Sequence, residues 1–263
     1  MLIDNKFIYI SLPRCASTAF HYSCILNDIK TQNATNEWNT QNAKIDFSKV
    51  DKLEIMNHIY HGHESLNELQ NIFGTKYDVI AVKRDRYERF YSLYKHILSD
   101  FKRLGLDSFY DVLSKITLDE LFFFTQGDLI NKKKRWEVIS QFLIKLGLFD
   151  EPIDVSITLP HRKHMVNYWI QEKNAYVVNI IDILITPISY WTHNNPNIIW
   201  FDFNNLSKLE EWVSNKIDKP FKIEHVNSSK HIECDITLNN EFINKYDIIY
   251  DYYDIQKNKK TLI

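Results

Sequence analysis

Residues 7–20, FIYISLPRCASTAF, decide the fold class of this chain. Five strand-like residues run into a turn that contains Pro13, Arg14, two small residues and two hydroxyls, and an apolar helix begins there. The backbone N–H groups and the positive end of such a helix point at one spot, which favours a phosphate-like anion. Arg14 adds a charge that can bridge two oxygens, while Ser17 and Thr18 can cap the helix or donate hydroxyls to the ligand. An ordinary strand, turn and helix cap is the alternative interpretation.

The glycines of other phosphate-binding loops are missing from this one. The chain has five, Gly62, Gly74, Gly105, Gly127 and Gly147, so the first 61 residues contain none. The dinucleotide-binding and Walker A fingerprints are therefore both absent at this loop. If the loop binds a phosphate, it does so without the residues that those two classes of protein use.

The composition predicts a folded protein of a reducing compartment. Of the 263 residues, 44% are hydrophobic and 25% are charged, which fits a chain with a substantial core, and we expect a single domain over residues 1–263. The net charge of −2 gives no reason to expect nucleic-acid binding. Three cysteines, Cys15, Cys24 and Cys234, are too few for a disulfide framework or a four-cysteine metal site.

The amino-terminal residues lead almost directly into the first strand. Asp4 lies there in place of a basic-then-apolar leader, and no apolar run approaches about 18 residues. We therefore expect a cytoplasmic location and no membrane span. Cys15 in the loop could be a nucleophile, but neither of its neighbours is a base, which favours a packing role.

Short β-rich runs alternate with helix-like segments along the chain. Strands are predicted at 7–11, 53–57, 78–83 and 198–203, and helices at about 17–29, 64–72, 86–102, 130–146, 204–217 and 239–256. Continuous apolar strands separated by helices indicate an α/β fold with a mostly parallel sheet. Ligands of such sheets bind at the carboxyl ends of the strands, so the loops that follow the strands are the candidate site.

A second strand-into-helix loop lies in VKRDRYERFYSLY, residues 82–94. Asp85 followed by Glu88 has the spacing of a capping box and predicts the start of the helix. Arg84 comes where the strand ends, so its guanidinium and the Ser92 hydroxyl, eight residues on, could converge on one anion. Two anion sites on one sheet fit a ligand with two separated phosphates.

Together these motifs resemble those of the PAPS-dependent sulfotransferases, especially the carbohydrate type. LPRCAST at 12–18 is similar to the family's 5′-phosphosulfate loop, and the 82–94 segment is similar to its 3′-phosphate motif. HVNSSKH at 225–231 resembles the late loop that covers the nucleotide. The resemblance implies a P-loop-like parallel sheet flanked by helices, PAPS as sulfuryl donor and no metal. The nucleotide-binding residues that it implies are Arg14, Cys15, Ala16, Ser17, Thr18, Arg84, Ser92, Ser229 and Lys230.

Two residues depart from the family's pattern. The family usually has lysine in place of Arg14, and because arginine does not readily give up a proton, we expect Arg14 to serve catalysis by stabilising charge. The second motif usually has proline in place of Arg86. A cation in the first helical turn opposes the helix dipole unless an anion lies nearby, so Arg86 either adds to nucleotide binding or points into solvent.

Histidines lie between the two motifs in NHIYHGHESLNEL, residues 57–69. His58, His61 and His63 could hold a metal, but Glu64 follows at a predicted helix start and no cysteine ligand is near, which disfavours a metal site. The Tyr-His-Gly-His run resembles the acceptor-side motif of some uronic-acid 2-O-sulfotransferases, which implies that His63, or else His61, is the catalytic base. Histidine suits that role because its ring is neutral near pH 7. A surface or packing role is the alternative.

The implied reaction moves a sulfuryl group from PAPS to an acceptor hydroxyl and leaves PAP. Only the resemblance favours a glycan as acceptor, and the candidates for its pocket are His161, Arg162, His164 and the basic run at 132–135, which otherwise reads as a solvated helix face. A nucleotide or small-molecule kinase is one rival, disfavoured because the loop has no Walker lysine and the chain shows no clear magnesium carboxylate. A non-catalytic glycan- or anion-binding protein is the other.

Overall fold

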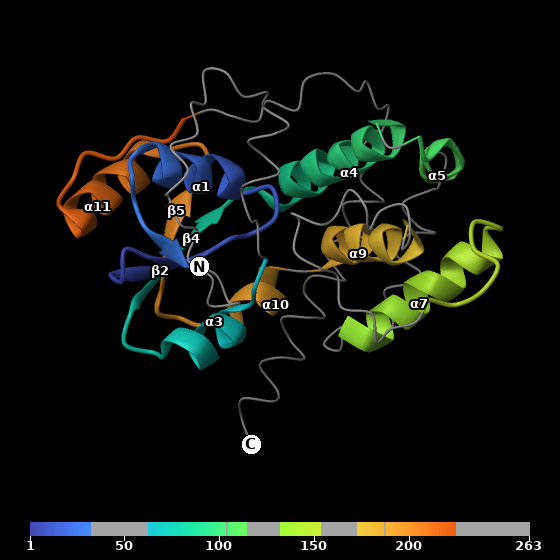
Figure 1. Ribbon diagram of the computed structural model, residues 1–263, viewed down its shortest axis with the longest axis horizontal. Helices are drawn as coiled ribbons and strands as arrows, with labels where there is room; N and C mark the ends of the chain where they lie inside the picture. Colours follow the sequence, from blue (N-terminus) through green and yellow to red (C-terminus); the bar gives the residue numbers. More distant parts are fainter. Residues whose placement is uncertain (33–62, 104, 115–131, 154–172, 187, 225–263) are drawn as a thin grey trace. The chain divides into compact units, whose positions relative to one another are not determined.

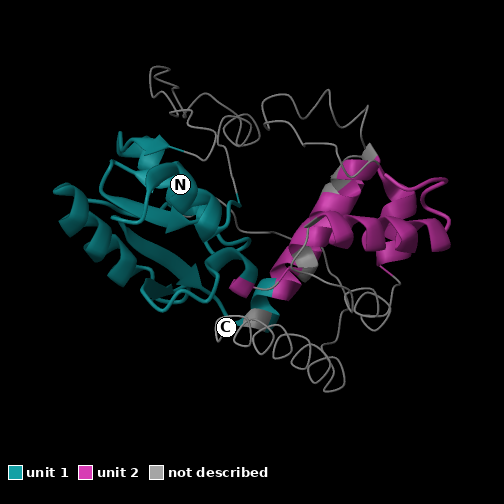
Figure 2. Cartoon of the chain, turned by 90° about the horizontal axis from the view of Figure 1, so that it is seen from below, with its two compact units in different colours: residues 1–89, 190–228 teal, residues 90–189, 229–263 magenta. Residues whose placement is uncertain are grey.

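The computed structural model describes residues 1–32, 63–103, 105–114, 132–153, 173–186 and 188–224. The chain divides into two compact units, one of residues 1–89 and 190–228 and one of residues 90–189 and 229–263 (Figure 2). The predicted strand at 53–57 and the predicted helix at 239–256 lie outside the described residues. The single domain expected from the sequence stays a prediction.

The first unit contains an open sheet of five strands in the order β3-β1-β2-β4-β5 (Figure 1). The strands are β1 (Leu2–Ile3), β2 (Phe7–Ile10), β3 (Thr31–Gln32), β4 (Asp78–Lys83) and β5 (Ile198–Asp202). β2, β4 and β5 run parallel, whereas β1 pairs antiparallel with both β2 and β3. The α/β class is therefore confirmed, and the sheet is mixed because two short strands that the sequence did not reveal extend it beyond β2.

Aromatic contacts hold helices against the sheet in this unit. Figure 1 shows α1 (Ser17–Leu26) and α11 (Ser207–Ile217) on one side, with α3 (Leu66–Phe73) and α10 (Ile188–Thr192) on the other. Tyr9 of β2 stacks on Phe20 of α1 with ring centroids 4.0 Å apart, and Phe7 meets Trp212 of α11 edge-on at 5.0 Å. All four residues of β2 are buried, as expected of a strand covered on both faces.

The described residues of the second unit are helical. They form most of α4 (Arg86–Arg103), together with α5 (Asp107–Leu113), α7 (Lys132–Lys145) and α9 (Lys173–Ile185). No helix in the described ranges combines the length and the apolar character needed to cross a bilayer.

A buried ion pair joins α7 to α9. Arg135 Nε lies 2.5 Å from Asp182 Oδ1, a second guanidinium nitrogen lies 3.2 Å from Oδ2, and Trp136 Nε1 donates to the same carboxylate at 3.3 Å. Arg135 is 2% exposed and Asp182 is 4% exposed. The interpretation of residues 132–135 as a uniform solvated face is therefore wrong for Arg135, because its charge is used inside the unit and is not available to an acceptor.

Candidate functional site

The loop between β2 and α1 contains two residues in the left-handed backbone region. Arg14 has φ 61° and Ala16 has φ 60°, and neither is glycine. A residue with a Cβ costs about 1–2 kcal/mol in this region, and such strain is retained mostly at functional sites. We call the turn at residues 13–16 the nest, because left-handed residues within a turn are typical of loops whose backbone N–H groups bind an anion, although the N–H of Cys15 itself donates to Leu12. The loop thus adopts without glycine a conformation that glycine would adopt freely.

Contacts from β2 fix this loop in place. The Tyr9 hydroxyl donates to the Cys15 carbonyl oxygen at 3.3 Å, and Cys15 N donates to the Leu12 carbonyl oxygen at 3.2 Å. Ala16 occupies the N-cap of α1, where it makes no side-chain hydrogen bond, and the first turn contains no acidic residue. Ser17 and Thr18 therefore lie within the first turn, and no carboxylate of that turn offsets the positive helix end.

Three arginines gather around the loop. Burial raises the pKa of the Cys15 thiol, and the positive charges of Arg89, Arg84 and Arg14 oppose that rise. The Arg84 backbone N–H also donates to that sulfur, so the loops after β2 and β4 are in contact. Cys15 itself is fully buried. These facts support the packing role of Cys15 and an anion site beside it.

Arg89 is the member of this group that sequence reasoning missed. It is fully buried although it is an arginine in the first turns of α4. The available signal was its place three residues after Arg86 and three before Ser92, and that spacing does not reveal that the side chain is buried.

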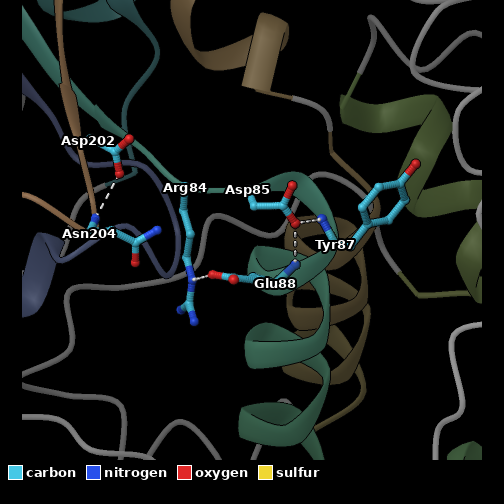
Figure 3. Close-up of polar contacts among 6 residues, drawn as sticks. All are labelled: Arg84, Asp85, Tyr87, Glu88, Asp202 and Asn204. Atoms are coloured by element: carbon cyan, nitrogen blue, oxygen red, sulfur yellow. Dashed lines mark hydrogen bonds and ion pairs between the residues drawn. The ribbon is translucent and has the colours of Figure 1, made fainter.

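Arg84 is positioned by an aromatic ring and a carboxylate. Its guanidinium carbon lies 4.3 Å from the centroid of the Phe203 ring, and its Nε lies 3.4 Å from Glu88 Oε2. In Figure 3 the Arg84 side chain extends between Asn204 and Glu88. The Glu88 side chain is 53% exposed, and an exposed pair of this kind is weak, so a phosphate can compete with the carboxylate for Arg84.

The start of α4 agrees with the sequence prediction. Asp85 Oδ1 accepts from the N–H groups of Tyr87 and Glu88, each at 3.0 Å, and the helix begins at Arg86 (Figure 3). Among the described contacts, the Glu88 carboxylate accepts from Arg84 Nε. Among the same contacts it does not accept from the Asp85 backbone N–H, which a capping box would require. Because Asp85 fixes the first turn, it also fixes the place of Arg84 at the end of β4.

His63 is held beside the end of β2. Its Nδ1 donates to the carbonyl oxygen of Ser11 at 2.6 Å, and Ser11 directly follows the strand. In a neutral ring with the proton on Nδ1, Nε2 carries the lone pair and is the nitrogen that can take up a proton. The Trp191 ring lies 6.0 Å from the His63 ring, tilted by 59°. The predicted base is therefore an oriented histidine next to the loop of Arg14.

Other predicted site residues are not brought together here. The residues outside the described part of the chain are His58, His61, His161, Arg162, His164, Ser229 and Lys230. Ser92 is buried in the second unit, and its sharing of an anion with Arg84 stays a prediction. Within the described ranges, His, Cys, Asp and Glu side chains do not gather in groups of three as metal ligands would.

Comparisons of the chain with protein-family models, with curated proteins and with solved structures find no match. Any functional conclusion must therefore come from the motifs and from the geometry of the nest, the arginines and His63.

Proposed function

We propose that the protein is a sulfotransferase that moves a sulfuryl group from PAPS to an acceptor hydroxyl and releases PAP. One observation supports the proposal: a loop with left-handed, non-glycine residues, the charges of three arginines and a hydrogen-bonded histidine come together after the parallel strands β2 and β4. The carboxyl ends of adjacent parallel strands are where open α/β sheets bind their ligands. The motif resemblance supplies the identity of the donor.

The nest is suited to the 5′-phosphosulfate of the donor. Its backbone N–H groups and the first turn of α1 can donate to the phosphate and sulfate oxygens, and Ser17 and Thr18 add hydroxyls. Arg14 adds a fixed positive charge that stabilises the charge developing on the leaving oxygen. Arg84 is the candidate for the 3′-phosphate, with Arg89 contributing to the positive potential of the same region.

His63 supplies the base in this scheme. The acceptor oxygen forms a bond to the sulfur while the bond from sulfur to the bridging phosphate oxygen breaks, and that oxygen leaves with the electron pair as part of PAP. The acceptor proton passes to His63 Nε2, the nitrogen that carries the lone pair of the neutral ring when Nδ1–H donates to the Ser11 carbonyl. Arg14 cannot take this proton because its guanidinium is always charged.

Ligand-induced stabilisation tests the donor. At a hundredfold excess over its dissociation constant, PAP should stabilise the fold by about 2.7 kcal/mol, which is a melting shift of roughly 5 to 10 °C for a domain of this size. AMP, and ATP with magnesium, should shift the melting temperature much less. An equal shift with ATP and magnesium would favour a kinase. PAPS turnover is then followed by mass spectrometry over glycans, small alcohols and phenols, and PAP binding without any turnover would favour a non-catalytic binding protein.

Arg84→Ala tests the 3′-phosphate assignment. Loss of a charge-assisted contact should weaken PAP binding by about ten- to a hundredfold while leaving 5′-AMP binding nearly unchanged. Lys83→Ala is the matched control, because it removes one exposed positive charge from the adjacent position. Equal weakening of PAP and AMP by Arg84→Ala would place Arg84 away from the 3′-phosphate.

A further inference from the structure

The loop after β5 brings an aromatic ring to Arg84, the candidate for the 3′-phosphate. The guanidinium carbon of Arg84 lies 4.3 Å from the centroid of the Phe203 ring, within the range of a cation–π contact. Arg84 directly follows β4, Phe203 directly follows β5, and the two strands run parallel. Parallel pairing therefore sets the two residues side by side at the edge of the sheet where its strands end.

Backbone hydrogen bonds fix the position of Phe203. Its N–H donates to the carbonyl oxygen of Lys83 at 2.9 Å, which extends the pairing of β4 with β5. Asp202 then turns the chain, because its Oδ1 accepts from Asn204 N at 2.8 Å and its carbonyl oxygen accepts from Asn205 N at 3.0 Å. Figure 3 shows the first of these two bonds. The Phe203 ring is therefore presented from a turn that is hydrogen-bonded on both sides of it.

The Arg84 guanidinium has three surfaces with different neighbours. Its flat face is covered by the Phe203 ring, and its Nε lies 3.4 Å from Glu88 Oε2. Within the part of the chain that the structure describes, the hydrogen bond and ion pair of this side chain use Nε and leave both terminal nitrogens for a ligand. Stacking on the face does not compete with hydrogen bonding at the edge, so a phosphate can bind these nitrogens while the ring stays in place.

The two neighbours of Arg84 act differently on an incoming anion. The Glu88 carboxylate is negative, so it repels a phosphate and competes with it for the guanidinium. The Phe203 ring has no net charge, and its face attracts the cation whether or not an anion is bound. The ring can therefore hold Arg84 in the bound state. An arginine has many rotamers, and holding it beforehand reduces the entropy that is lost when the ligand binds.

We propose that Phe203 is a positioning residue for the donor: it holds the Arg84 guanidinium by its face and so presents the terminal nitrogens to the 3′-phosphate. This inference rests on the proposed function, in which Arg84 binds that phosphate. The ring itself does not contact the phosphate in this scheme, so its effect on binding must pass through Arg84. A packing role for Phe203 is the alternative, and it predicts no difference between ligands with and without a 3′-phosphate.

Phe203→Leu tests the proposal because it keeps an apolar side chain and removes the ring face. In isothermal titration calorimetry it should weaken PAP binding by about three- to tenfold, as expected for loss of a partly exposed cation–π contact, and leave 5′-AMP binding nearly unchanged. Phe203→Tyr keeps the face and should bind PAP like the wild type. Trp200→Leu is the matched control, because it removes a ring that is 38% exposed on the strand before Phe203, and it should not change PAP binding.

Two further variants test whether the effect passes through Arg84. In an Arg84→Ala background, Phe203→Leu should not weaken PAP binding further, because the group that it positions is gone. Glu88→Gln should keep or raise the affinity for PAP, because it removes the charge that competes with phosphate. The inference is overturned if Phe203→Leu binds PAP like the wild type, if it weakens 5′-AMP as much as PAP, if it is equally harmful without Arg84, or if Glu88→Gln weakens PAP binding instead.

A nuclear Overhauser measurement on the wild-type protein needs no variant of Phe203. The Nε–H signal of Arg84 is the one that Arg84→Lys removes, and it should show a cross-peak to the Phe203 ring protons with and without PAP. Loss of the cross-peak on addition of PAP would overturn the inference, since the ring would then not hold Arg84 in the bound state. Failure of the proposed function looks different, because PAP would then not bind the wild type at all, and the inference would fall with it even where the cross-peak is seen.

Discussion

His63→Asn separates the two nitrogens of the candidate base. The amide nitrogen of asparagine can occupy about the position of imidazole Nδ1, so this variant can keep the donation to the Ser11 carbonyl, 2.6 Å long in the wild type, while it has nothing at the position of Nε2. His63→Ala removes both functions. If His63 is the base, both variants should lower kcat by about a hundred- to ten-thousandfold, the usual worth of general-base catalysis.

The melting temperatures of the two variants should differ. Ser11 is 2% exposed, so His63→Ala leaves its carbonyl oxygen without the His63 donor, which costs about 1–3 kcal/mol. At roughly 2–4 °C per kcal/mol for a protein of this size, the melting temperature should fall by about 2 to 12 °C. His63→Asn should stay near the wild type. Thermal melts followed by circular dichroism, with PAP release as the rate assay, measure both effects.

The pH dependence of turnover gives an independent check. Wild-type turnover should fall as pH drops through the range in which histidine ordinarily titrates, about pH 6.5, because a protonated base cannot accept the acceptor proton. This acid limb should be absent from the residual activity of His63→Asn. The reasoning is refuted if His63→Asn keeps wild-type turnover and its acid limb, since His63 would then only support the Ser11 carbonyl. If His61→Ala abolishes turnover instead, the two histidines exchange roles.

Two further predictions concern stability. Asp182→Ala leaves the buried Arg135 charge without its carboxylate and should lower the free energy of unfolding by about 3–5 kcal/mol in urea denaturation, whereas Asp78→Ala, at the half-exposed pair with Lys216, should cost no more than about 1 kcal/mol; similar losses would contradict the burial of the first pair. Burial raises the pKa of the Cys15 and Cys24 thiols above the unfolded value of 9.0, so above that pH the unfolded chain loses protons that the folded protein keeps, and stability should fall as pH rises. Each thiol can contribute at most about 1.4 kcal/mol per pH unit to this slope, Cys24→Ala should remove the contribution of Cys24, and a flat unfolding free energy above pH 9 would show that neither thiol is shifted.

Local patterns in the sequence determined the centre of the fold. The apolar runs of β2, β4 and β5 and the helices α1, α3, α4, α7 and α11 were all predicted, with ends that differ from the observed ones by a few residues. Caps explain the best-defined starts, since Ser65 and Glu68 form a capping box at α3 and Asp85 caps α4. These elements were readable because each depends on residues within one or two turns of itself.

Elements that depend on distant partners were not readable in this way. β1 and β3 have two residues each, which is too few to show any periodicity. They are strands because β1 pairs with β2, and β3 pairs with β1. α9 contains a long apolar run with several β-branched residues, which carries little helical pattern, and it is anchored through the buried pair of Asp182 with Arg135 of α7. Tertiary contacts decided these elements, as they commonly override weak local preference.

In the candidate site, too, residues in local motifs were predictable and contacts between distant segments were not. Arg14, Arg84 and His63 were predicted because each lies in a local motif, either directly after a strand or in a histidine-rich run. The sequence could not show that Arg89 is buried and that its charge acts on Cys15, that Ser11 orients His63, or that Trp191 packs on the same ring. Those contacts join segments far apart in the chain. The approach of the loops after β2 and β4 depends on the two strands running parallel, which brings their carboxyl ends to one edge of the sheet.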